Sequence, residues 1–387
     1  MKKIKVIRII DRLNIGGPAI HSILLTAGLN KKRFETILIT GKICEFEGDM
    51  GYLATENGVQ PIFIPELSRD ISIKSDLIAL WKIMKIIKKE KPDIIHTHKS
   101  KAGAIGRLAS IFLRVPVIIH TFHGHVFHSY FGKLKSKIFL QIERILAYFT
   151  TKIIVISENQ FNEICNIYRL ASPKKFKIIP LGFDFSPLMR INEFKGVLKK
   201  EFNINESTIT VGIIGRLTYV KNHNMFLKVA QIVLNQRKNV KFLIIGDGEL
   251  KEKLIEQAKS LGIDKDIIFT GWIKSLPKIY SDLDIVTLTS FNEGTPVTII
   301  EAMFCKKPVV TTNVGGISDL VIDKKTGYLI KKNDVENFSK ALIELIDDPI
   351  KRSTFGENSF EYIKEKYSKE RLIKDIEELY FNLTEKN

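Results

Sequence analysis

From residue 285 to residue 301 the chain reads IVTLTSFNEGTPVTIIE, a short apolar run followed by a polar loop and a helical pattern. Thr295 belongs to the residue types that cap helices and Pro296 suits the first helical position, so a helix is expected to begin here. A helix N-terminus offers unpaired N–H groups and a positive dipole end to a phosphate. Glu293 and Glu301 can then hydrogen-bond hydroxyl groups on either side of that phosphate, which fits a sugar nucleotide.

The alternation of strand and helix recurs along the whole chain. Strands that alternate with helices form βαβ units, in which helices cover both faces of a mainly parallel sheet. We therefore expect two doubly wound α/β domains. The expected strands are 5–10, 34–40, 94–97, 115–121 and 152–156 in the first half, with helices from 18, over 73–89, after 101 and from 133, and 208–214, 240–245, 267–270, 285–289 and 308–311 in the second.

The expected boundaries follow from this alternation. Residues 1–182 form the first domain, 183–207 a linker that contains Pro187 and a charged helical stretch, and 208–365 the second domain. Ligands of open α/β sheets bind beyond the carboxyl ends of the strands, so two such domains facing each other would place the ligand in a central cleft.

The net charge of +17 is concentrated in the first half of the 387 residues. Residues 1–180 carry 29 Lys and Arg against 14 Asp and Glu, whereas 181–387 carry 31 against 29. A basic half can attract nucleic acid, an anionic membrane surface or a phosphorylated substrate. Zinc-finger spacings and an aromatic RNP pattern are both absent from the sequence, so nucleic acid is not an expected partner.

The apolar runs are short and interrupted by charges, as in residues 1–10, so neither a membrane-spanning helix nor a signal peptide is expected. This pattern favours a cytoplasmic protein. Cys44, Cys165 and Cys305 are few and widely spaced, as is usual for buried, reduced thiols.

Each half begins with a strand that runs into glycine. Gly16 and Gly17 lead directly into a helix, and such a turn lets the backbone approach a ligand. In the second half Gly215 is followed by Arg216 and Lys221, a planar fork and a mobile point charge that suit a diphosphate. For this pair alone, a solvated loop is the alternative.

Two further motifs look like known binding patterns. Gly246-Asp247-Gly248 lacks the third glycine of a dinucleotide fingerprint, so we expect a tight turn with backbone contact to the ligand and no nicotinamide cofactor. Asp282 and Asp284 resemble a metal-binding pair of acids, but they precede a buried strand. A role at a turn or helix end is expected, and no metal is assigned.

Histidines cluster in the first half, and a zinc site is one interpretation of them. Their spacing matches no zinc pattern, so we expect one or two to face the ligand and the others to be hydrogen-bonded locally. His123, which follows a strand and precedes a glycine, is best placed to reach a sugar. The six are His96, His98, His120, His123, His125 and His128.

The segment 126–149 combines an aromatic, basic loop with an amphipathic helix. Its apolar stripe is expected to pack on the sheet, as in most soluble domains. The loop could contact lipid headgroups or a lipid-linked acceptor. The loop contains Phe127, Tyr130, Phe131, Lys133, Lys135 and Lys137, and the stripe contains Leu134, Ile138, Ile142, Ile145 and Phe149.

Taken in order, these motifs resemble the retaining two-Rossmann (GT-B) glycosyltransferases of family 4. The resemblance covers nearly the whole chain and includes Gly16-Gly17-Pro18, the run Thr-Phe-His-Gly-His-Val-Phe at 121–127, Gly215-Arg216 with Lys221, Gly246-Asp247-Gly248, the pair Glu293 and Glu301, and the final segment 367–380.

The resemblance implies a GT-B fold whose last helix, within 366–387, crosses back to the first domain. It implies that Glu293 contacts the transferred sugar, that Glu301 holds the ribose, and that Arg216 and Lys221 neutralise the leaving diphosphate. This sequence departs from the family pattern at Lys221-Asn222, where Lys-Gly is usual.

The resemblance also implies that the helix start (Gly294, Thr295 and Pro296), together with Gly16, Gly17 and Gly246, contacts the donor. His123 is implied to lie near the sugar. Neither a cofactor nor a divalent metal is expected, because two cations and a helix N-terminus already stabilise the leaving group.

The expected activity is transfer of a sugar, with retention, from a nucleotide-diphosphate donor, expected to be UDP-linked, to an acceptor hydroxyl. Residues 121–127 are similar to those of members that act in bacterial surface-polysaccharide assembly. The basic first half suggests that the acceptor-binding domain sits on the anionic inner face of the membrane and takes a lipid-linked saccharide as acceptor. The alternatives are a UDP-sugar epimerase of the same architecture and a non-catalytic partner subunit of a transferase.

Overall fold

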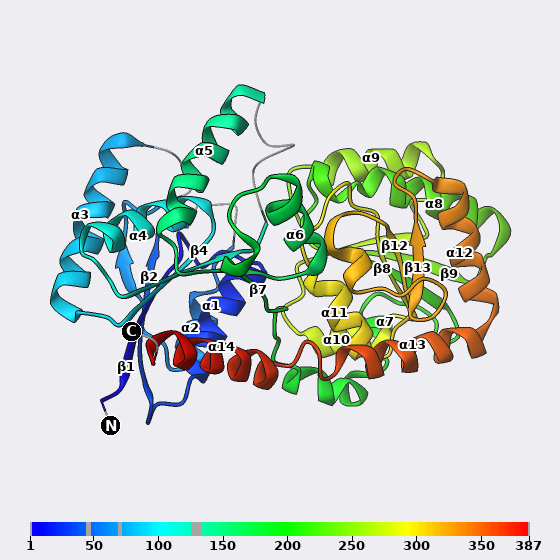
Figure 1. Cartoon of the computed structure of the whole chain (residues 1–387). Coiled ribbons are helices and arrows are strands. Elements are labelled where there is room, and N and C mark those ends of the chain that lie inside the picture. Colours follow the sequence, from blue (N-terminus) through cyan, green and yellow to red (C-terminus); the bar gives the residue numbers. More distant parts are fainter. Residues whose placement is uncertain (1, 44–47, 69–71, 125–132, 386–387) are drawn as a thin grey trace. The chain divides into compact units, whose positions relative to one another are not determined.

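The computed structural model describes residues 2–43, 48–68, 72–124 and 133–385 (Figure 1). The chain divides into two compact units. The first contains Met1–Phe183 together with Lys369–Asn387, and the second contains Asp184–Ser368.

The first unit is built on a seven-stranded parallel sheet of order β3-β2-β1-β4-β5-β6-β7. The central strands are rich in Ile and Val because both of their faces are buried. Its strands are β1 (Ile4–Ile9), β2 (Phe34–Gly41), β3 (Ile62–Ile64), β4 (Ile94–His98), β5 (Val117–Phe122), β6 (Lys152–Val155) and β7 (Phe176–Ile178).

Helices cover both faces of this sheet. On one face, α3 and α4 pack their small and branched residues, such as Ala79, Ile83 and Ala109, on Ile7 and Ile95. The same face holds α5, and the opposite face holds α1 and α14. The helices are α1 (Gly17–Gly28), α2 (Gly51–Glu56), α3 (Ile73–Glu90), α4 (Ser100–Phe112), α5 (Lys133–Phe149), α6 (Glu158–Phe161) and α14 (Lys369–Thr384).

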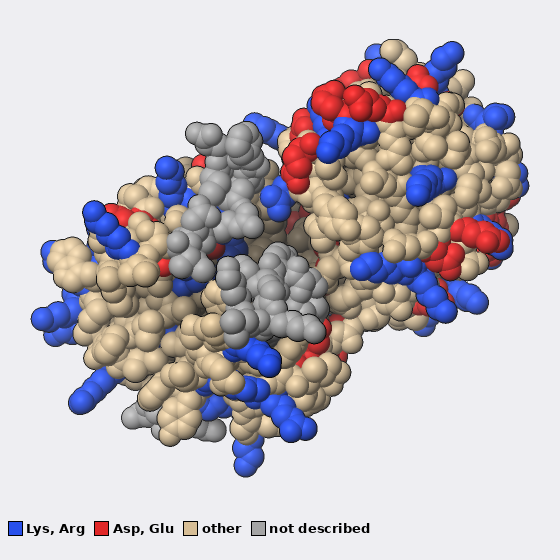
Figure 2. Space-filling model, turned by 90° about the horizontal axis from the view of Figure 1, so that it is seen from above, with Lys and Arg blue, Asp and Glu red and all other residues tan. Residues whose placement is uncertain are grey.

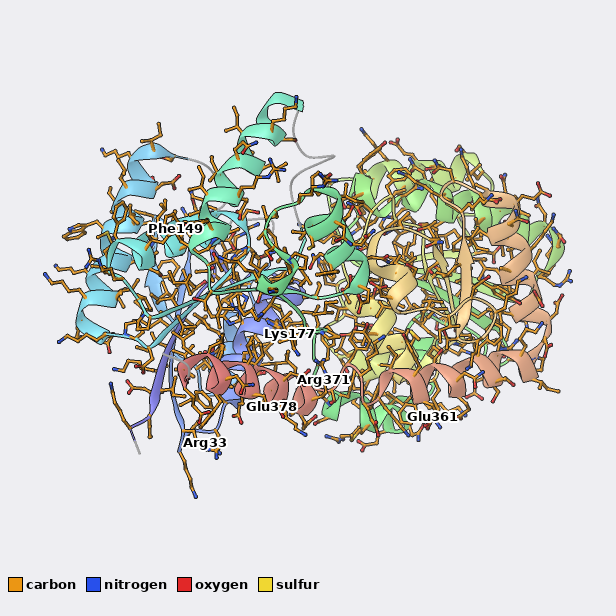
Figure 3. All side chains as sticks on the ribbon, viewed as in Figure 1. Arg33, Phe149, Lys177, Glu361, Arg371 and Glu378 are labelled. Atoms are coloured by element: carbon orange, nitrogen blue, oxygen red, sulfur yellow. The ribbon has the colours of Figure 1, made fainter. Side chains whose placement is uncertain are left out.

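Helix α14 returns from the second unit to the first, as expected. Its Leu372, Ile376 and Tyr380 are fully buried in the core beside Val6 and Ile94. At its start, the Arg371 guanidinium donates to the carbonyl oxygens of Pro180 and Leu181, at 2.9 and 2.6 Å (Arg371 is labelled in Figure 3). The last helix therefore completes the core of the first unit.

The second unit repeats the design with a six-stranded parallel sheet of order β10-β9-β8-β11-β12-β13. Its strands are β8 (Ile209–Ile214), β9 (Val240–Ile245), β10 (Ile267–Gly271), β11 (Ile285–Leu288), β12 (Val309–Thr312) and β13 (Gly327–Ile330). Its helices are α7 (Val197–Glu201), α8 (His223–Gln236), α9 (Lys251–Ser260), α10 (Leu276–Asp282), α11 (Val297–Phe304), α12 (Val335–Asp347) and α13 (Pro349–Ile363).

The expectation of two doubly wound domains is confirmed, but three short strands at or near the sheet edges, β3, β7 and β13, were not predicted. The predicted linker, residues 183–207, contains a 3₁₀ helix at Ser186–Phe194 and α7, and from Asp184 onward it belongs to the second unit. No helix among the described residues has both the length and the apolar composition needed to span a bilayer.

The prediction that the apolar stripe of α5 packs on the sheet is wrong for the residues whose side chains are described. Ile138, Ile142, Ile145 and Phe149 are all exposed. The buried side of α5 instead carries Leu146, Ala147 and Glu143. A charged residue occupies the core side because it has a buried cationic partner, Arg107 of α4.

The Arg107–Glu143 pair is almost completely buried. Arg107 Nη2 donates to both carboxylate oxygens of Glu143, at 2.9 and 2.7 Å, and Arg107 Nε donates to the carbonyl oxygen of Gly103 at 2.8 Å. The arginine side chain has no exposed surface and that of Glu143 is 8% exposed. The pair therefore ties α5 to α4 beneath the outer surface.

We predict that Glu143→Gln destabilises the first unit by about 3 kcal/mol or more, because it leaves a buried guanidinium without a counter-charge. Urea unfolding followed by circular dichroism measures the change. The control is Glu66→Gln, which removes the partner of Lys82 in a more exposed pair. Equal shifts of the unfolding midpoint in the two variants would contradict this account.

Candidate functional site

The N-terminus of α11 lies in the second unit, at the carboxyl edge of its sheet. The helix begins at Val297, and Pro296 is its N-cap, so the prediction of Thr295 as cap and Pro296 as first helical residue is wrong by one position. No side chain caps this end and no acid stands in the first turn. The first N–H groups of the helix therefore have no partner within it and remain available to an anion.

Glu293 is held in the loop before α11 by two donors. Lys221 Nζ lies 2.7 Å from Glu293 Oε1, and Ser290 Oγ donates to the same oxygen at 2.6 Å. The side chains of Lys221 and Glu293 are 22% and 11% exposed. Ser290 was not singled out in the sequence, although its place directly after β11 puts it at the ligand-binding edge. From the sequence, Lys221 and Glu293 were expected to contact different parts of one ligand. In the structure they contact each other directly.

The backbone of Glu293 is fixed by the loop that follows β12. Gly316 N donates to the carbonyl oxygen of Glu293 at 3.2 Å. Gly315 adopts φ of 54°, and a Cβ at this position would lie 1.8 Å from the same carbonyl oxygen. Only glycine allows this approach. Neither glycine was predicted as a site residue from the sequence, although both follow a strand as Gly16 and Gly215 do.

Glu301 lies in the second turn of α11 and is hydrogen-bonded by a tyrosine. Tyr280 Oη, from the fully buried Tyr280 of α10, donates to Glu301 Oε2 at 2.7 Å. Burial raises the pKa of Glu301 to about 7, and the hydrogen bond from Tyr280 lowers that pKa. The carboxyl group can therefore gain or lose its proton near neutral pH. Tyr280 is a second residue that the sequence did not reveal.

The loop after β8 carries the two expected cations, Arg216 and Lys221, which differ in their exposure and in their partners. Arg216 is exposed, and its guanidinium has no hydrogen bond or ion pair within the described parts of the chain. Lys221 closes a 3₁₀ turn, and Asn222 follows it at φ 51° and ψ 48°. This left-handed conformation explains why glycine is usual there, and asparagine tolerates it better than most residues do. The turn geometry is therefore preserved despite Asn222.

Gly246 brings the ends of β8 and β9 together. A Cβ on Gly246 would lie 2.0 Å from the carbonyl oxygen of Gly215, so the two strand ends could not pack with a larger residue there. Gly246 N donates to the carbonyl oxygen of Gly271 at 3.0 Å. The tight turn expected at Gly246 is present and supports the loop that carries Arg216.

The acidic pair before β11 has structural partners. Asp282 accepts hydrogen bonds from the backbone N–H groups of Gly196, Leu198 and Lys199, at 2.6 to 3.0 Å, and thereby holds the start of α7. Asp284 accepts from the backbone N–H of Thr210 at 2.8 Å. The expected role at a helix end is confirmed for Asp282.

In the first unit, the histidines separate into two groups. His96 is hydrogen-bonded to Tyr380 and Thr121, at 2.6 and 2.7 Å, and His120 lies 2.9 Å from Thr97 Oγ1. His96 is therefore hydrogen-bonded locally through both ring nitrogens, as predicted for part of the cluster, whereas His120 Nε2 is buried without a hydrogen-bond partner among the described residues. His125 and His128 lie outside the described residues.

The second group contains His21 of α1, His98 at the end of β4 and His123 after β5. His98 Nδ1 lies 3.1 Å from His123 Nε2, and each of the three rings offers a nitrogen within 4.8 Å of the other two. Burial and the charge of Lys99 lower the pKa of His123 to about 3. Neutral imidazoles can ligate a metal. However, Lys99 and Arg8 would repel a cation here, since both also depress the pKa of nearby histidines.

Next to these histidines, Lys99 joins the ends of β1 and β4. Its Nζ lies 3.0 Å from Asp11 Oδ1 and donates to Asn14 Oδ1 at 2.8 Å. The sequence analysis missed Lys99 and Asp11. Gly16 is the N-cap of α1, which begins at Gly17 and has no side-chain cap and no acid in its first turn. No described side chain therefore competes with an anion for the N–H group of Gly17 at this helix end.

Comparison with known families matches almost the whole chain. A family model described as Glycosyltransferase Family 4 matches residues 15–186, and one described as Glycosyl transferases group 1 matches residues 195–362.

Curated relatives cover most of the chain as well. The UDP-Gal:alpha-D-GlcNAc-diphosphoundecaprenol alpha-1,3-galactosyltransferase of Escherichia coli is 31% identical over 348 residues, which is 88% of either protein. The GalNAc-alpha-(1->4)-GalNAc-alpha-(1->3)-diNAcBac-PP-undecaprenol alpha-1,4-N-acetyl-D-galactosaminyltransferase of Campylobacter jejuni is 27% identical over 383 residues, covering 97% of this chain and 99% of that protein.

Among solved structures, Anabaena HepE in complex with UDP superposes with a TM-score of 0.80 over 98% of this chain and 100% of its own, at 21% identity. At this identity the likeness concerns the fold. The chain therefore belongs to the family 4 glycosyltransferases, with the two Rossmann-like units of the GT-B fold.

Proposed function

We propose that this glycosyltransferase moves a sugar from a UDP-linked donor to a hydroxyl group of a lipid-linked saccharide, with retention at the anomeric carbon and without a divalent metal. The relatives from E. coli and C. jejuni are named for diphosphoundecaprenol- or PP-undecaprenol-linked substrates, and the E. coli enzyme for a UDP-linked donor. The proposal places the reaction in bacterial surface-polysaccharide synthesis, at the inner face of the membrane.

The observation that carries the proposal is the contact of Lys221 with Glu293 beside the uncapped start of α11. A lysine, an exposed arginine and free helix N–H groups supply three kinds of donor to a diphosphate. Lys221 and Ser290 both bind Oε1 of Glu293, and Oε2 accepts no hydrogen bond from the described residues, so it can accept one from a sugar hydroxyl.

In this proposal, catalysis consists mainly of stabilising the leaving group. As the bond between the sugar and the diphosphate breaks, negative charge grows on the UDP, and Arg216, Lys221 and the N–H groups of α11 bind that charge more strongly than they bind the intact donor. Glu293 orients the sugar, Glu301 accepts hydrogen bonds from the ribose, and His123 lies near the sugar. The acceptor hydroxyl attacks from the face that the diphosphate leaves.

The first test is titration of the protein with UDP, GDP and ADP by calorimetry, followed by the sugar nucleotides of the preferred base. We expect UDP to bind most tightly, in chelator-treated buffer as well as with added Mg²⁺. Tighter binding of GDP or ADP would overturn the donor assignment, and a strict requirement for Mg²⁺ would overturn the metal-independent mechanism.

We predict that Arg216→Ala and Glu293→Gln each reduce kcat at least tenfold, because a hydrogen bond to a charged group contributes about 1.5–3 kcal/mol. Initial rates of sugar transfer measure the effect. The control is Arg237→Ala. Arg237 follows α8 at the opposite end of the sheet and pairs with Asp347. Wild-type rates in either site variant would refute the assignment of the site.

The protonation of Glu301 predicts a pH dependence of UDP affinity. Since burial raises its pKa to about 7, the carboxylate that accepts ribose hydroxyls is formed as the pH rises through 7. Affinity should therefore increase between pH 6 and pH 8. In Glu301→Gln, this increase of UDP affinity with pH should disappear. The ratio of wild-type to variant affinity at each pH removes the contribution of the titration of UDP itself.

Tyr280→Phe extends the same test. Tyr280 donates a hydrogen bond that lowers the pKa of Glu301, so its removal should move the midpoint of the affinity profile to higher pH. An unchanged midpoint in Tyr280→Phe would show that Glu301 does not control the profile.

A further inference from the structure

Helices α3, α4 and α5 form one layer of the first unit, and α4 contacts both α3 and α5. The side of this layer that faces away from the sheet exposes ten large apolar side chains, which we call the outer apolar face. Trp81, Phe112 and Ile145 are 59%, 66% and 62% exposed. The face comprises Ile73, Leu77 and Trp81 of α3, Leu108 and Phe112 of α4, and Ile138, Ile142, Ile145, Tyr148 and Phe149 of α5.

These residues do not belong to the core of the unit. Ile73, Leu77 and Trp81 follow one another at four-residue steps and form a stripe on α3. The core side of the same helix is made by other residues, Ala79 and Ile83 among them, which pack on the sheet. Helix α5 likewise has a buried side and a separate apolar stripe. A soluble domain rarely leaves so many large apolar side chains exposed on one layer without a binding partner.

The surroundings of the face are strongly basic. Residues 73–149 contain 14 Lys and Arg but only 4 Asp and Glu. Of these acids, Asp76 lies 2.6 Å from Lys101 and Glu143 is paired with buried Arg107, so little negative charge is left to oppose the lysines. Figure 2, a view from above Figure 1, shows scattered blue side chains and few red ones over the first unit.

Aromatic and basic residues also meet directly on this face. Lys85 Nζ lies 4.8 Å from the centre of the Trp81 ring. Lys175 Nζ also lies 5.8 Å from the centre of the Tyr148 ring, but it donates to three carbonyl oxygens at the end of α5 and serves to anchor that end. Tryptophan and tyrosine favour the boundary between lipid headgroups and acyl chains, and lysines extend from that depth to the phosphates.

We propose that the outer apolar face docks on an anionic lipid bilayer, with the side chains of α3 and α5 entering the headgroup boundary and the surrounding lysines contacting lipid phosphate. A second copy of the chain is a poorer occupant, because it would bring two basic surfaces together. The inference deepens the proposed function, since it rests on the proposed lipid-linked acceptor and names the surface that approaches the membrane.

Vesicle flotation tests the docking. The full-length protein should float with vesicles of phosphatidylcholine and phosphatidylglycerol more than with pure phosphatidylcholine. The double variant Ile142→Asp with Ile145→Asp should lower the partition coefficient tenfold or more, because two apolar side chains no longer enter the boundary. The matched control is Ile350→Asp on α13 of the second unit, where the isoleucine is 78% exposed, and it should partition like the wild type.

The emission of Trp81 reports insertion into the bilayer without any substitution on the outer apolar face. The chain has two tryptophans, Trp81 and Trp272. In Trp272→Phe, the fluorescence of Trp81 should shift to the blue on addition of anionic vesicles and be quenched by brominated acyl chains. In Trp81→Phe, the signal of Trp272 in the second unit should stay unchanged.

Several results would overturn the proposal. If high salt abolishes flotation, and the wild type and the double variant float equally at low salt, then the protein binds the vesicles through charge alone. Trp81 emission unaffected by vesicles would exclude insertion, and a dimer that the double variant converts to monomer would make a second copy the occupant. Measuring UDP affinity and flotation in the same variants separates this proposal from the preceding one. Arg216→Ala should weaken UDP binding and leave flotation unchanged. The double variant should reduce flotation and leave UDP binding unchanged.

Discussion

Parallel pairing of the strands is the constraint on which both units depend. Because every pair within the two sheets of the described chain is parallel, the carboxyl ends of the strands in each sheet share one edge. The neighbours β8, β11 and β12 therefore bring Lys221, Glu293 and Gly315 together although almost a hundred positions of sequence intervene. In the other unit, β4 and β5 bring His98 to His123 in the same way. The topology of each sheet therefore determines which residues become neighbours at the site.

This constraint explains how much the sequence could predict. Central strands such as β8 and β9 are continuous runs of Ile and Val that reveal a sheet buried on both faces, and glycines or charged residues after them mark its binding edge. The edge strands have less of this signal: β3, β7 and β13 were missed, and only the edge strand β10 was predicted. The contacts that orient Glu293 and Glu301 were missed as well. Ser290, Gly315 and Tyr280 are common residues whose roles depend on which loops become neighbours.

Helix α5 shows a different limit. A three- and four-residue periodicity reveals that a helix has an apolar stripe, but it does not reveal which side of the helix packs on the sheet. Here the buried side contains Glu143, whose charge is compensated by Arg107 from another helix. A long-range ion pair thus reversed the orientation that periodicity favours. The start of α11 is a smaller case, in which Pro296 caps the helix one residue before the expected arrangement.

The position of α14 has a consequence for the order in which the molecule assembles. Residues 369–384 supply Leu372, Ile376 and Tyr380 to the core of the first unit, yet a ribosome makes them only after the whole of the second unit. During synthesis the part of this sheet face that α14 covers therefore stays exposed while the second unit can already fold. The first unit is synthesised first, but its core is completed after that of the second unit. The incomplete first sheet is the surface that a chaperone would meet.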